Sequence, residues 1–241
     1  MEPVGQKKRS PWLYVGLGCG ALLLLSIVAA VVLVSFVVKK GQEYQEDLAN
    51  PIARTEMVKK TLGAKTLPEG YFAVMSLSVP ALMDVAVLSS QSPDAPRTEP
   101  SEELRMFVYM FLKMSPASEQ EQLRKYLEGQ SEDASVLARN GVRLGSGEIV
   151  ARGVLPLEDR RVLYAIQRGE LSTQHSERQG PGLNSIIFLE CPGQSRLRMG
   201  LWMASDPDPE TPFNELDLKG TPADPEAIRT FMSHLNPCKE S

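Results

Sequence analysis

The chain has little of the side-chain chemistry that enzymes and metal centres use. Its 241 residues include two histidines, His175 and His234, and three cysteines. Neither histidine has a partner at the spacing of a metal site, and no serine-hydrolase, zinc-protease or phosphate-loop motif is present. His175 lies in a polar, loop-like run, and His234 lies near the end of an expected helix, where a cation favours the helix dipole. We therefore expect no catalytic residues, no metal and no cofactor.

An excess of positive charge is also missing. From residue 39 onward the chain has 23 Lys and Arg against 29 Asp and Glu. Nucleic-acid binding needs a basic surface, so nucleic acid is not an expected partner. What the chain does have is one long run without any charge, the 27 residues from Trp12 to Val38.

The run Trp12–Val38 predicts a transmembrane helix. A bilayer core requires about 20 apolar residues in a helix, and this run exceeds that length. Trp12 and Tyr14 begin the run, and aromatic rings of this kind favour the headgroup level of a membrane. The run is too long for a cleaved signal peptide, and Cys19 lies too near its start for a lipid attachment site. An uncleaved anchor embedded in the lipid bilayer is the expected arrangement.

The charges that flank the run indicate its orientation. Lys7, Lys8 and Arg9 precede the run, whereas Lys39 and Lys40 follow it. Because the side with more Lys and Arg stays in the cytoplasm, we expect a cell-membrane protein with a cytoplasmic N-terminus and its C-terminal domain outside.

Gly16 and Gly20 place small residues four apart within the same run. Such a pair lets two membrane helices approach closely, which predicts a homodimer face. Glycine is also common in membrane helices, so the alternative is that the pair has no special role.

Beyond the run, residues 41–64 read as a polar helix interrupted at Asn50-Pro51, where a second helix can begin. This segment either continues the membrane helix as a stalk or packs on the domain. The expected organisation is a cytoplasmic tail over 1–10, a transmembrane helix over 11–39, a helical stalk over 40–66 and a soluble α+β domain over 67–241.

The domain is expected to be α+β, with a mainly antiparallel sheet of about six or seven strands and two packed helices. In residues 71–79 the apolar side chains alternate, which predicts a strand with one apolar face. Residues 105–114 are apolar at nearly every position, which predicts a strand buried on both faces. The expected helices cover residues 115–130, with a capping box from Ser118 to Glu121, and the segment that starts at Asp224-Pro225.

This order of strands and helices is similar to that of small α/β/α sandwiches of the PsbP and Mog1 type. The resemblance is one of element order alone, because no motif supports it. It implies a sheet between helical layers and carries no function or site residues to this chain.

Cys191 and Cys238 are the only cysteines outside the apolar run. An extracytoplasmic location permits their oxidation, and a bond between them would tie the last helix to the sheet. Chain entropy assigns such a crosslink about 4 kcal/mol for a loop of roughly 47 residues. The alternative is two unrelated buried thiols.

Arginine is concentrated in one part of the domain. Residues 139–198 hold nine Arg and no Lys, and several of these arginines fall on expected strands. Because a guanidinium matches carboxylate and phosphate geometry, Arg196 and Arg198 could face an anionic partner such as envelope polymer or lipid headgroups. The alternative is a solvated face paired with the acidic segment that follows residue 199. There, Asp206, Asp208 and Glu210 could bind Ca²⁺ or form a solvated linker.

Two classes of function remain. The first is a single-pass, membrane-anchored protein with a periplasmic-type, non-catalytic domain that binds another envelope protein or a ligand. The second is a membrane-tethered envelope enzyme, whose signature would be a deep pocket with converging acids, histidine or serine. The absence of catalytic motifs favours the first.

Overall fold

The computed structural model describes residues 44–95, 104–114, 116–139, 142, 147–170, 172–173, 176–177, 182–194 and 196–239. The chain divides into two units, Met1–Ala49 and Asn50–Ser241, and the second contains the whole sheet. The expected membrane helix, its Gly16 and Gly20, and His175 lie outside the described residues. Within the described residues, no helix is both long enough and apolar enough to cross a membrane.

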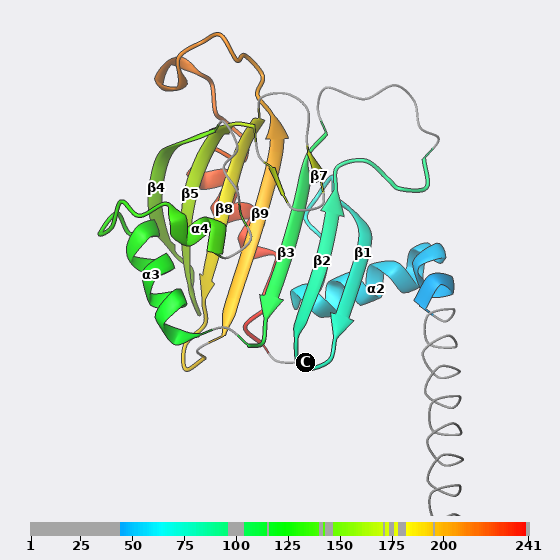
Figure 1. Cartoon of the computed structure of the whole chain (residues 1–241). Helices are drawn as coiled ribbons and strands as arrows, with labels where there is room; N and C mark the ends of the chain where they lie inside the picture. The colour runs from blue at the N-terminus through cyan, green and yellow to red at the C-terminus, as the bar shows by residue number, and fades with distance from the viewer. Residues whose placement is uncertain are drawn as a thin grey trace, which may run out of the picture. The chain divides into compact units, whose positions relative to one another are not determined.

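The second unit is built on one seven-stranded sheet in which every neighbouring pair is antiparallel (Figure 1). Its order is β1-β2-β3-β9-β8-β5-β4. The strands are β1 Phe72–Val79, β2 Met83–Ser89, β3 Met106–Leu112, β4 Glu148–Pro156, β5 Arg161–Gly169, β8 Gly182–Glu190 and β9 Leu197–Ser205. The short strands β6 Ser172–Thr173 and β7 Ser176–Glu177 pair only with each other. The antiparallel α+β class and the strand number are therefore confirmed.

Helices lie on both faces of this sheet, each held by its own apolar cluster. On one face, α2 (Pro51–Leu62) and α5 (Pro225–Ser233) pack on the core that includes Phe107, Trp202 and Phe231. On the other face, α3 (Ala117–Leu127) and the short α4 (Ser135–Arg139) cover β5, β8 and β9. The 3-10 turn η1 (Phe213–Glu215) precedes α5. The two helices expected in the domain correspond to α3 and α5, and α4 is an additional short helix.

The start of α2 moves the expected domain boundary. The Asn50 side chain accepts hydrogen bonds from the backbone N–H groups of Ile52 and Ala53, which begins the helix as the Asn-Pro pair predicts. Val58 and Leu62 of α2 are then fully buried in the sheet core. Residues 51–62 are therefore part of the domain and not of a stalk, so the boundary at residue 67 is replaced by one at Asn50.

β1 departs from simple alternation because it contains a bulge. Its register against β2 shifts between Ala73 and Met75. The residues after Val74 therefore face the opposite side of the sheet from the one that alternation, counted from Ala73, predicts. Ala73 and Ser76 both face α2, where the Ser76 hydroxyl bonds to the Thr61 hydroxyl at 2.7 Å. The expected single face of Tyr71, Ala73, Met75, Leu77 and Val79 is therefore wrong. A second register shift lies in β4, between Ile149 and Ala151.

The capping box expected at Ser118 is absent. The N-cap of α3 is Pro116, which has no side chain that can accept a hydrogen bond, and Ser118 lies inside the helix. Pro116 fixes where the helix begins, so the serine comes too late to act as the cap. The helix ends at Leu127, within the expected range 115–130, and Gly129 follows its C-cap with a φ of 75°.

Candidate functional site

The two soluble-domain cysteines meet beside the sheet. Cys191 directly follows β8, Cys238 follows α5, and the structure joins them in a disulfide with a Cα–Cα distance of 5.4 Å. The preceding strand and the Pro192-Gly193 turn hold Cys191 in place, because the backbone N–H of Gln194 donates to the Cys191 carbonyl at 3.1 Å. The bond therefore fixes the C-terminal segment against the end of β8.

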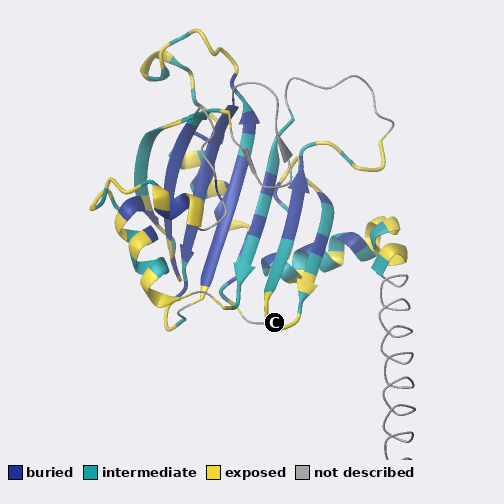
Figure 2. Ribbon diagram, in the orientation of Figure 1, coloured by how far each residue is buried: buried dark blue, intermediate teal, exposed yellow. Residues whose placement is uncertain are grey.

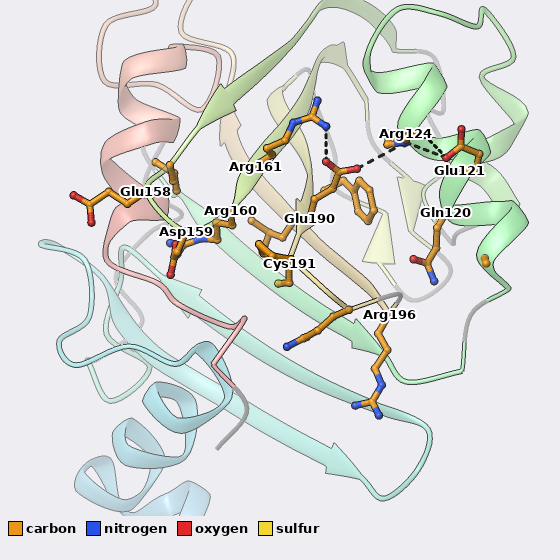
Figure 3. A pocket seen from close by; sticks show the side chains of 16 residues that line it. Gln120, Glu121, Arg124, Glu158, Asp159, Arg160, Arg161, Glu190, Cys191 and Arg196 are labelled. Atoms are coloured by element: carbon orange, nitrogen blue, oxygen red, sulfur yellow. Dashed lines mark hydrogen bonds and ion pairs between the residues drawn. The ribbon is translucent and has the colours of Figure 1, made fainter.

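A hollow of about 650 Å³ lies beside this disulfide (Figure 3). Acidic and basic side chains are equally numerous in its wall. Arg161 reaches Glu190 at 2.8 Å, and Glu190 lies 3.8 Å from Arg124. Arg124 also binds Glu121, and this hydrogen bond is the main reason that the pKa of Glu121 is lowered. The lining residues are Ala117, Gln120, Glu121, Arg124, Leu157, Glu158, Asp159, Arg160, Arg161, Phe188, Leu189, Glu190, Cys191, Pro192, Gln194 and Arg196.

The described lining of the hollow offers no nucleophile with a neighbouring base. Its described lining contains no histidine, serine, threonine or lysine, and its cysteine is in the disulfide. Nucleophilic catalysis needs an activated nucleophile beside a base. Arg160 has a structural role, because its buried guanidinium donates to the backbone carbonyls of Met232 and Leu235 at the end of α5. The wall of the hollow is thus a set of ion pairs that ties α3, β5 and β8 together.

The two arginines expected to face an anion do not form a common surface. Arg198 is 1% exposed; its Nε donates to the Pro237 carbonyl at 3.2 Å, and its guanidinium lies 4.2 Å from the centre of the Phe111 ring. Arg196 is exposed and lies 6.0 Å from the same ring. The expectation is wrong for Arg198, because its position on β9 directs it into the core, where no external partner can reach it.

The acidic segment after β9 is held by an arginine and not arranged around a metal. Arg168 binds the buried Asp206 carboxylate at 2.6 Å and also donates to the Asp208 and Thr211 carbonyls. The Asp208 carboxylate accepts from the Thr211 hydroxyl, which lowers its pKa. Among the described residues, no three potential ligands cluster as a metal site would require. The alternative interpretation, in which arginine pairs with the acidic segment, therefore holds for Arg168.

One half of a sheet face has no helix over it in the described residues. The face that α3 and α4 cover on β5, β8 and β9 continues across β3, β2 and β1 without a helix (Figure 2). We call this part the open face. Its side chains follow from the strand registers, which align them in rows across the three strands. They are Phe72, Met75, Leu77, Val79, Met83, Val85, Val87, Ser89, Met106, Val108, Met110 and Leu112.

The open face is apolar and incompletely buried. It contains no charged residue, and its one polar side chain, Ser89, is buried. Val87 is also buried, Phe72 is 46% exposed, and the other nine residues are partly exposed. Met114, two residues after the end of β3, is 75% exposed. A connected apolar patch of this kind on a folded domain is a mark of an interaction site.

Comparison with known proteins does not decide the role of the hollow or of the open face. Neither protein-family models nor curated proteins nor solved structures gave a match to this chain. The geometry of the chain itself is therefore the basis on which a function can be assigned.

Sequence reasoning missed the open face as a functional surface, although the signal was present. Residues 105–114 are apolar at nearly every position, and β3 was expected to be buried on both faces. In the structure Phe107 and Tyr109 are buried, whereas Val108, Met110 and Leu112 are partly exposed. The expected burial is thus wrong for this face within the single chain. A strand that is apolar on both sides yet covered on one is the signal that could have identified the surface.

Proposed function

We propose that the protein is a single-pass, membrane-anchored protein whose folded unit, from Asn50 onward, is an extracytoplasmic, non-catalytic binding domain. The open face is the surface through which it binds a partner protein. The observation that carries this proposal is the apolar, partly exposed face of β1, β2 and β3. A protein in water gains free energy when a contiguous apolar surface of this type is buried, at roughly 25 cal/mol per Å².

Two independent features support the location. The uncharged run Trp12–Val38 has the length of a membrane span, and more basic residues precede it than follow it. The Cys191–Cys238 bond fits an oxidising compartment, since disulfides rarely persist in a reducing cytoplasm. Both features favour a domain on the outer side of the membrane.

The location is tested by reporters and by thiol chemistry on the full chain. An alkaline phosphatase fused after residue 241 should be active, and a fluorescent protein fused there should be dark when exported through the general secretory route. In the second test, intact cells are treated with an alkylating agent, and the protein is then denatured in the same agent without reductant. Cys19 alone should be alkylated. Alkylation of Cys191 and Cys238 in the same sample would indicate a reducing compartment and overturn the proposal for location.

The binding role is tested separately in membranes. A photo-crosslinking amino acid in place of Met110, on the β3 side of the open face, should yield a discrete adduct with another protein. The same amino acid in place of Val154 is the matched control, because Val154 is a 37% exposed apolar residue on the opposite edge strand. Equal crosslinking at both positions, or none at Met110, would contradict a binding role for the open face.

A membrane-tethered enzyme is the alternative, and the hollow beside the disulfide would be its site. Its described wall offers ion pairs between α3, β5 and β8 and no nucleophile with a neighbouring base. The ion pairs have a sufficient structural role, so the binding proposal is the better supported of the two.

A further inference from the structure

The occupant of the open face can be specified further, on the basis of the proposed function that this face binds a protein. We propose that the open face binds one amphipathic α-helix of a partner protein, through the apolar stripe of that helix. Three properties of the surface lead to this inference: its dimensions, its methionine content and the way in which the rest of the same sheet is covered.

The dimensions of the open face suit a single helix. Strands of about seven residues at roughly 3.4 Å per residue are about 24 Å long, and three strands spaced roughly 4.8 Å apart are about 14 Å wide. A helix with its side chains is about 10–12 Å across, and 24 Å of helix is about 16 residues. The surface therefore accommodates one helix of about four turns that runs along the strands.

The same dimensions argue against a second copy of this chain as the occupant. The plan area of the open face is roughly 340 Å², whereas a stable protein interface buries about 800 Å² on each partner. Two open faces stacked on each other would fall well short of that area. A partner helix needs less, because further contacts of its parent protein can lie elsewhere.

Methionine is concentrated on and around this surface. Met75, Met83, Met106 and Met110 lie on the open face, and Met203 lies beside Met106 on the neighbouring strand β9. With Met114 at the end of β3, six of the ten methionines in the chain gather here. Methionine is flexible and polarisable, and surfaces rich in it can adapt to apolar helix faces of different sequence.

The rest of the sheet shows what kind of element covers it. On the same face, α3 and α4 cover β5, β8 and β9, and on the reverse face α2 and α5 pack on the core (Figure 1). Leu112 and Val108 of the open face already contact the cluster beneath α3 and α4. A partner helix on the open face would lie beside those helices and complete the helical layer.

The test uses the full chain in nanodiscs, with 13C-labelled methionine methyl groups as the reporters. The probe is a synthetic 16-residue helix with leucine at positions i, i+3, i+4 and i+7 and with alternating lysine and glutamate elsewhere. The control probe has the same composition without that spacing, and empty nanodiscs measure binding of either probe to lipid. We expect the helical probe, and not the control, to shift the methyl signals of Met75, Met83, Met106 and Met110.

Matched variants show whether the binding site is the open face. Replacing Met75 and Met110 together by Gln should weaken binding of the helical probe at least tenfold, whereas Val154→Gln should leave the affinity within twofold. Unchanged dispersion of the other methionine methyl signals shows that the Gln variant is folded. If it is not, Met110→Gln alone is compared with Val154→Gln, with a threefold weakening expected.

Three results would overturn the inference. Absence of shifts with the helical probe would do so, as would a concentration-dependent shift without any probe, which identifies a second copy as the occupant. Broadening of the same methyl signals by a paramagnetic lipid would identify the bilayer as the occupant. If crosslinking at Met110 succeeds while the helical probe fails, the proposed function stands and only the helical nature of the partner is refuted.

Discussion

At the scale of single residues, the domain contains buried polar side chains that form hydrogen bonds or ring contacts inside the fold. Arg198 is the largest of these, on β9 between the Phe111 ring and the C-terminal segment. Its Nε–H bond to the Pro237 carbonyl ties the sheet to the segment that also carries Cys238. A charged side chain buried in this way is costly to leave without partners, so its role is structural.

We expect Arg198→Met to lower the free energy of unfolding by about 1–3 kcal/mol, because the apolar replacement fills the space but cannot satisfy the Pro237 carbonyl. The matched control is Arg196→Met, two residues away and exposed, which should change the value by less than about 0.5 kcal/mol. Urea denaturation of both variants, followed by near-ultraviolet circular dichroism, measures the difference. Equal effects would show that the buried hydrogen bonds of Arg198 contribute little.

The buried tyrosines predict an upper pH limit for the fold. Burial of the phenol is the main reason that the pKa of Tyr109 is raised above its ordinary value of 10.0, and neighbouring Arg198 lowers it by less. Burial likewise raises the pKa of Tyr71. Because the folded pKa exceeds the unfolded one, the stabilising effect of the neutral phenol is complete below pH 10 and decreases as the pH rises above it.

We therefore expect the absorbance of ionised tyrosine near 295 nm to rise in two stages above pH 10. The second stage should coincide with the loss of near-ultraviolet circular dichroism, because the buried phenols ionise when the domain unfolds. A single stage centred at pH 10, with the fold intact, would contradict the burial of these side chains.

At the scale of elements, the sequence predicted helix ends well where a side chain makes the cap. Asn50 before Pro51 and Asp224 before Pro225 both accept hydrogen bonds from the first turns of α2 and α5. Ser118 has the correct spacing from Glu121, but Pro116 begins α3 two residues earlier. Spacing alone does not identify a cap, because the backbone that precedes the helix decides which residue occupies the first position.

The caps allow a direct comparison of two single changes. We expect Asn50→Ala to lower the thermal midpoint by the equivalent of about 1 kcal/mol, since it removes both acceptor contacts at the start of α2. Ser118→Ala should be neutral or slightly stabilising, because alanine is the better residue inside a helix. Differential scanning calorimetry of the two variants tests this comparison. A lower thermal midpoint of the Ser118→Ala variant would support the predicted capping box.

The face of a strand was predicted less well than its position. Strands β1 and β3 lie within two residues of their predicted ranges, 71–79 and 105–114. The bulge at Val74 then exchanges the faces of Met75, Leu77 and Val79, and no turn or glycine signal in the sequence marks it. Because side chains alternate along a strand, one inserted residue reverses every later position, and the contribution of β1 to the open face could not be predicted from the sequence for that reason.

At the scale of the whole molecule, the disulfide joins the end of a central strand to the C-terminal segment. Cys191 and Cys238 close a loop of 47 residues that contains β9, the irregular acidic segment and α5. Their pairing was predictable because only two cysteines lie outside the apolar run. The hollow beside them was not predictable, since its wall comes from α3, β5 and β8, which are far apart in sequence.

We expect replacement of both cysteines by serine to lower the free energy of unfolding by about 4 kcal/mol, because the unfolded chain regains the freedom that the closed loop removes. Reduction of the unaltered chain should give a similar loss. The measurement is urea denaturation with and without reductant, and the Cys-to-Ser variant itself serves as the control that should not respond to reductant. A response of that variant would show that the reductant acts elsewhere.

The two strands at the margins of the sheet, β1 and β4, are the two in which the pairing register shifts. A marginal strand presents unpaired N–H and C=O groups that can recruit a strand from another molecule, and a bulge twists those groups out of line. Both margins are thus poor templates for added strands, which matters for a domain with an apolar face beside one of them. Assembly through β1 or β4 into extended fibres is therefore disfavoured. Deleting Val74, which would straighten one margin, should make the protein aggregate with the spectroscopic signature of added β-structure.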